Sequence, residues 1–82
     1  MEKSLYSPDQ KKMQTLLRQI RVDANLTQAD LAQILSRPQS FISKYESGER
    51  LLDIIELREL CSAVGVSLVD FVKRLEVLLN ET

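Results

Sequence analysis

Apolar residues recur every three to four positions along most of the chain, and they do not alternate regularly with polar residues. This spacing places apolar side chains on one face of an α-helix, whereas a half-buried strand needs alternation. The chain therefore predicts an all-α fold. The apolar stripes of four helices are Met13, Leu16, Leu17 and Ile20; Leu31, Ile34 and Leu35; Leu57, Leu60, Cys61 and Val64; and Phe71, Val72, Leu75 and Leu79.

A helix-start signature precedes each stripe. A capping Ser, Thr or Asp followed three residues later by an acidic or amide side chain satisfies free amide groups at a helix N-terminus. The four pairs are Ser7 with Gln10, Thr27 with Asp30, Asp53 with Glu56, and Ser67 with Asp70. The first helix is expected from about Pro8 to Ala24, because Pro8 suits a first turn and Asn25 tolerates a left-handed conformation.

A fifth helix is predicted between the second and fourth starts. Ile42 and Tyr45 share a face there, Pro38 can open the helix, and Gly48 can close it. The connection from Leu35 to Pro38 is short, so the second and third helices must turn sharply against each other, as in a helix-turn-helix unit. We predict a compact five-helix domain over residues 7–79, with a flexible arm at 1–6 and a frayed end at 80–82.

Composition argues against an enzyme. The chain has 82 residues, enough for one domain, and it contains no histidine and one cysteine. Zinc clusters and Ser-His or Cys-His couples are therefore excluded, and no cofactor is implied. Cys61 lies in an apolar stripe and is interpreted as a small buried side chain. The acidic residues Asp53, Glu56 and Glu59 resemble a metal-binding or catalytic carboxylate group only superficially. Favourable electrostatics at a helix start explain two of the three.

Charge and hydropathy limit the partners. No apolar run approaches the ~20 residues that span a bilayer, and the first six residues do not look like a secretion signal, so we expect a cytoplasmic protein with no membrane partner. The net charge is −1, but residues 1–50 carry +2 and residues 51–82 carry −3. A basic face can come only from the first half.

The predicted third helix presents a polar face made by Gln39, Ser40, Ser43 and Lys44. Gln can bond an adenine edge through two atoms, Ser can donate or accept, and Lys can reach guanine or phosphate, so this face suits a DNA major groove. An ordinary solvated face is the alternative, and from this pattern alone it is the more common explanation.

Two segments carry a family resemblance. They are Leu26-Thr27-Gln28-Ala29-Asp30-Leu31-Ala32 and the run from Pro38 to Arg50, Pro-Gln-Ser-Phe-Ile-Ser-Lys-Tyr-Glu-Ser-Gly-Glu-Arg. Together they resemble the Cro and λ-repressor-like (XRE) family of helix-turn-helix DNA-binding domains, over about residues 10–75. The resemblance implies a λ-repressor-like bundle that binds double-stranded DNA through its third helix.

Residue by residue, the resemblance implies that Gln28 binds phosphate and braces a reading side chain of the third helix. Gln39, Ser40, Ser43 and Lys44 fall on base-facing positions, Ala32, Ile42 and Tyr45 on buried ones, Glu46 has a structural role, and Arg50 is a backbone-contacting cation. Arg37 precedes the third helix and is a further phosphate candidate. The family often has Gly where this chain has Ser36 and a capping Ser where it has Pro38, so we expect a different turn conformation at Ser36.

Two apolar features have alternative explanations. Phe41 either contacts a thymine methyl or packs across the turn onto the second helix, which we favour. The last helix has a wide apolar surface, and we expect Leu75, Leu78 and Leu79 to stay exposed in a monomer and to form a dimer interface. Alternatively, Val77 and its neighbours cover the first helix, or the chain once continued into a further domain that covered this surface.

The sequence thus predicts a transcriptional regulator of bacterial or phage type, such as a repressor. As a homodimer, it would present two third helices about 34 Å apart to an inverted-repeat operator. An antitoxin-like or adaptor protein, whose main partner is another protein, is the alternative function.

Overall fold

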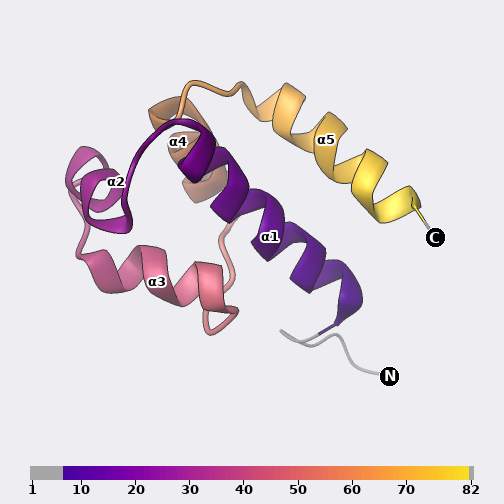
Figure 1. Cartoon of the computed structure of the whole chain (residues 1–82), viewed down its shortest axis with the longest axis horizontal. Helices are drawn as coiled ribbons and strands as arrows, with labels where there is room; N and C mark the ends of the chain where they lie inside the picture. The colour runs from indigo at the N-terminus through magenta and orange to yellow at the C-terminus, as the bar shows by residue number, and fades with distance from the viewer. Residues whose placement is uncertain (1–6, 82) are drawn as a thin grey trace.

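The computed structural model describes residues 7–81 and contains five helices and no strand in that range. The helices are α1 (Pro8–Asp23), α2 (Gln28–Ile34), α3 (Gln39–Ser47), α4 (Ile54–Ala63) and α5 (Leu68–Asn80). Figure 1 shows α2 and α3 on one side of α1 and α5 on the other, with α4 packed behind. The all-α prediction is confirmed. The predicted arm at 1–6 lies outside the described residues.

The four predicted helix starts are present. Ser7, Thr27, Asp53 and Ser67 each accept a hydrogen bond from the backbone amide three residues later. Thr27 and Asp53 form complete capping boxes, because Asp30 and Glu56 accept bonds back from the cap amides at 3.0 Å. These short-range bonds explain why local sequence was enough to locate four helices.

The turns also follow local chemistry. Gly48 ends α3 with φ 90°, a left-handed conformation that glycine adopts without Cβ strain, and Asn25 takes φ 62° after α1. Ser36 has φ 56°, in the same left-handed region. Our expectation of a different conformation at Ser36 was wrong: the serine adopts the geometry that suits the glycine common at this position.

The core is a single cluster to which α1–α5 all contribute. Its fully buried members include Tyr45, Phe71, Ile20, Leu31, Ile42, Leu60 and Cys61. Two members of the predicted stripes face outward instead, since Ile34 is 53% exposed and Val72 is 40% exposed. Helical periodicity identifies a face only to within about one position, and these two lie at its border.

The last helix is oriented differently from the prediction. Leu75 and Leu78 are half-buried and pack against the core, and Leu79 is also half-buried. The expectation that these leucines stay exposed was therefore wrong for Leu75 and Leu78. The exposed large apolar side chains of α5 are Val69, Val72 and Val77.

Candidate nucleic-acid interface

The polar face of α3 is open to solvent. Gln39, Ser40 and Lys44 are exposed and Ser43 is half-buried, while Ile42 on the opposite face is completely buried. The Ser43 hydroxyl donates to the Ser40 carbonyl at 3.4 Å. The four predicted base-reading residues thus share one accessible helix face, with side chains that donate and accept hydrogen bonds.

A buried ion pair supports this face from behind. The Arg21 guanidinium on α1 donates to both carboxylate oxygens of Glu46 on α3, at 2.7 and 3.0 Å, and to the Leu26 carbonyl at 2.8 Å. The Arg21 and Glu46 side chains are only 9% and 5% exposed. The hydrogen bond to Glu46 raises the pKa of Arg21, so the guanidinium stays charged.

Gln28 connects the ion pair to the exposed face. Its Nε2 donates to Glu46 Oε1 at 3.1 Å, and its Oε1 accepts a long bond from Gln39 Nε2 at 3.5 Å. A carboxylate can only accept, so Glu46 fixes which way the Gln28 amide points. Gln39 is left with its Oε1 and one N–H, which is the donor and acceptor pair that an adenine edge requires. The bracing of Gln39 by Gln28 is present in the structure.

The two predicted phosphate-binding arginines share a carboxylate. Arg50 makes a bidentate pair with Glu56, at 3.0 and 2.9 Å, and Arg37 Nη1 lies 3.7 Å from Glu56 Oε2. Both guanidinium carbons lie over the Phe41 ring, at 4.4 Å for Arg37 and 4.8 Å for Arg50 from its centroid. These pairings and the Asp53 amide lower the pKa of Glu56 to about 2. From sequence, Glu56 was recognised only as a helix-start residue.

Phe41 is buried, with 8% exposure, and meets Tyr45 edge-on with ring centroids 5.6 Å apart. Of the two explanations for Phe41, packing is the one its burial supports, because a ring this covered presents little surface to a thymine methyl. Its neighbours include the two arginines, which sequence spacing did not indicate.

The remaining chemistry-bearing residues do not form a reactive site. Cys61 is completely buried, and burial raises the pKa of its thiol, which agrees with the packing interpretation. Within residues 7–81, no group of three or more His, Cys, Asp or Glu side chains could hold a metal ion. The same range contains no helix with the length and hydrophobicity of a membrane span.

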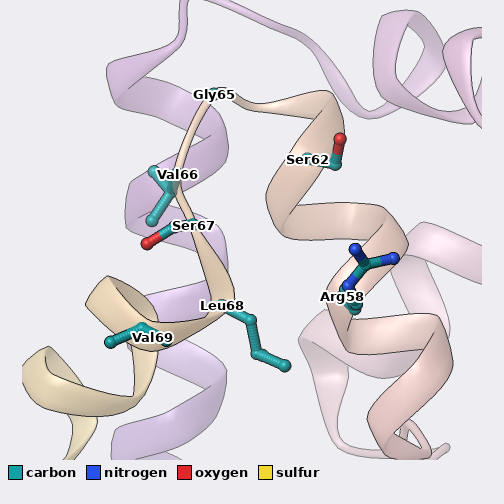
Figure 2. Close-up of a pocket in the computed structure, with 7 residues that line it drawn as sticks. All are labelled: Arg58, Ser62, Gly65, Val66, Ser67, Leu68 and Val69. Atoms are coloured by element: carbon teal, nitrogen blue, oxygen red, sulfur yellow. The ribbon is translucent and has the colours of Figure 1, made fainter.

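A cavity of about 570 Å³ lies at the turn between α4 and α5 (Figure 2). It is wide open to solvent, and Val66, Leu68 and Val69 supply its apolar wall, with Arg58 and Ser62 opposite. None of these lining residues belongs to α2 or α3, and Figure 1 shows the turn above α4, across the molecule from α3. The cavity is therefore separate from the polar face of the helix-turn-helix.

Comparison with known proteins identifies the family. A helix-turn-helix family model matches residues 17–71, which include α2, α3 and the turn between them. The chain belongs to this family. An XRE-family-like protein from Pseudomonas syringae pv. tomato str. DC3000 is similar at 40% identity over 82% of this chain and 85% of that one, with a TM-score of 0.72.

A second similar structure is a point mutant of the restriction–modification controller protein C.Esp1396I. It shares 31% identity over 92% of this chain and 98% of its own, with a TM-score of 0.78. No curated protein matches the chain. Family membership makes this helix-turn-helix chain a DNA-binding transcriptional regulator rather than an enzyme.

Proposed function

We propose that the chain is a homodimeric regulator that reads an inverted-repeat operator with the polar face of α3. The observation that carries this proposal is the hydrogen-bonded series from the Arg21–Glu46 pair through Gln28 to Gln39. A side chain braced in this way loses less conformational freedom on binding, and its remaining atoms match adenine. A merely solvated helix face has no need of such bracing.

Within this proposal, Gln39, Ser40, Ser43 and Lys44 contact base edges in the major groove. Gln28, Arg37 and Arg50 contact the DNA backbone, which sets register without reading sequence. The net charge is −1, so we expect few ion pairs with phosphate and a salt dependence of the affinity that is less steep than for strongly basic binders.

Gln39→Ala tests the division between readers and positioners. It should cost about 1–3 kcal/mol on the preferred site and relax the preference at one base position, whereas Arg37→Ala should weaken all duplexes similarly. The measurement is binding to an operator selected from a random DNA pool and to its single-base variants. Equal, sequence-independent losses from both substitutions would contradict the assignment.

The proposed dimer forms along α5, through the part-exposed surfaces of Leu75, Leu78 and Leu79. Val72 is 40% exposed and lies seven residues before Leu79, close to it on the helix surface. A spacing of about 34 Å between recognition helices, which successive major grooves require, is within reach of two copies of a molecule measuring 36 × 24 × 20 Å.

Val72→Glu should produce monomers in sedimentation equilibrium and weaken binding to a two-half-site operator, because it places a charge in the interface. Val77 is 63% exposed but lies about 140° around the helix from Val72 at 3.6 residues per turn, so Val77→Glu is the matched control. An unchanged dimer in Val72→Glu, or equal dissociation of both variants, would argue against an interface centred on this face.

The antitoxin-like alternative predicts a stoichiometric protein partner instead. The similar structure is named a restriction–modification controller protein, and this supports a regulatory role over the alternative. A mobility shift with the purified chain alone, together with an inverted repeat among the selected sequences, supports the regulator. Loss of all DNA binding until a co-purifying protein is added would favour the alternative.

A further inference from the structure

Glu56 holds two arginines that come from opposite ends of the recognition helix. Arg37 lies just before α3 and Arg50 just after it, yet both reach the same carboxylate on α4. The side chain of Glu56 is 14% exposed, whereas those of Arg37 and Arg50 are 37% and 38% exposed. The carboxylate is therefore mostly covered, and the two cations form its outer surface.

The two guanidinium groups are held in one arrangement around Glu56. Glu56 balances the charge of one of them, and the carboxylate of Asp53 also attracts Arg50. The guanidinium carbons lie over the buried Phe41 ring, 4.4 and 4.8 Å from its centroid, so each arginine has an ionic contact and a cation–π contact. Long cationic side chains lose rotational freedom in such a setting before any ligand arrives.

Both arginines retain donors for a second anion. Arg50 spends Nη1 and Nη2 hydrogens on Glu56 and a further Nη1 hydrogen on the Leu51 carbonyl, which leaves its Nε–H and one Nη2–H. Arg37 stands 3.7 Å from Glu56, beyond hydrogen-bond range, so its donors are not consumed by that contact. Planar, pre-oriented guanidinium groups suit phosphate oxygens.

We propose that Glu56 is a positioning residue that aims Arg37 and Arg50 at phosphate oxygens of the DNA backbone. This inference rests on the proposed DNA-reading role of α3. It gives Glu56 a part in DNA binding although a carboxylate repels DNA by itself. The sign of its effect is therefore opposite to the one that charge alone predicts.

Glu56→Gln is the test, because glutamine preserves the capping box with Asp53 and removes only the charge that holds the arginines. Binding to the selected operator and to an unrelated duplex should both weaken about three- to tenfold, the cost of immobilising a long side chain at the interface. The plot of log affinity against log salt should become shallower, because backbone contacts are lost. Circular dichroism melting checks that the variant is folded.

Glu59→Gln is the matched control, since it removes the same charge from an exposed position on the same helix. It should leave affinity unchanged or slightly tighter. A second check is the double variant Arg50→Ala/Glu56→Gln: the loss caused by Glu56→Gln should shrink by at least half when Arg50 is already absent. That non-additivity is not expected if Glu56 only stabilises the fold.

Tighter binding by Glu56→Gln, equal to the effect of Glu59→Gln, would overturn the inference and make Glu56 a counter-ion that masks the arginines. The inference would also be overturned if Glu56→Gln caused the same loss of affinity in the Arg50→Ala variant as in the unmodified chain. If the unmodified chain selects no duplex at all, the proposed function itself fails. Operator selection by the unmodified chain, run first, separates these two failures.

Discussion

Removing either partner of the buried Arg21–Glu46 pair should strongly destabilise the protein. In Glu46→Leu, the Arg21 guanidinium remains in a site where its side chain is 9% exposed, with the Leu26 carbonyl as its remaining acceptor. Leaving one buried charge unpaired costs about 3–5 kcal/mol. At roughly 0.05–0.15 kcal/mol per residue, a chain of this length has a total stability of about 4–12 kcal/mol, so the loss is a large fraction of it.

The double variant Arg21→Met/Glu46→Leu separates the pair's net contribution from the cost of an orphaned charge. Replacing both partners with apolar side chains removes the unpaired charge, and such replacements are often neutral or stabilising. We therefore expect the double variant to recover at least about 2 kcal/mol relative to Glu46→Leu alone. The control is Arg18→Met on the exposed side of α1, which should change stability by at most about 0.5 kcal/mol.

Urea unfolding followed by circular dichroism at 222 nm measures these differences in unfolding free energy. The comparison requires that the slope of the free energy against urea concentration is the same in all variants. If Glu46→Leu costs less than about 1 kcal/mol, the pair is screened by water and our reading of its burial is wrong. Additive losses in the double variant would equally refute the argument, because they would mean that the two side chains act independently.

Three further predictions concern stability. Ser36→Gly should stabilise the protein by about 1 kcal/mol, because Ser36 carries Cβ strain at φ 56°, and thermal melting should show a rise of several degrees; a fall would refute this. Gly48→Ala should lower the melting temperature, because its Cβ would stand 2.6 Å from Gln14 Nε2 and φ is 90°; an unchanged melt would contradict it. Glu56 has a folded pKa of about 2, below its ordinary 4.5, so its contribution is present above pH 4.5 and lost as the pH falls towards 2; Glu56→Gln should therefore lose less stability on acidification than the unmodified chain, and equal losses would oppose this.

Local signals explain how much of the fold was predictable. Each cap is decided by residues three positions apart, and each stripe by residues within two turns, so the five helices could be placed from sequence. The side of α5 that meets the core could not be predicted from the sequence. Leu78 rather than Val72 packs inward because α5 must fit against α1 and α4, and that geometry is set by distant parts of the chain.

The same distinction applies to the candidate site. The exposed face of α3 follows from the burial of Ile42 and Tyr45 on the same helix, and it was predicted. The pairing of Arg37 with Glu56 was not, because a whole helix separates them in the chain. Residue type identified these arginines as phosphate candidates, but only the tertiary structure shows the carboxylate that holds them.

The side chain of Glu46 links the buried ion pair to the face that we propose reads DNA. Glu46 Oε1 accepts from both Arg21 Nη2 and Gln28 Nε2, so the contact that neutralises a buried cation also orients the amide that meets Gln39. A substitution at Glu46 that preserves the fold should therefore still change which base Gln39 prefers, since its amide would no longer be held in one orientation. Because charge balance and hydrogen-bond direction converge on one carboxylate, the base reading that we propose for Gln39 would be coupled to the packing of α1 against α3.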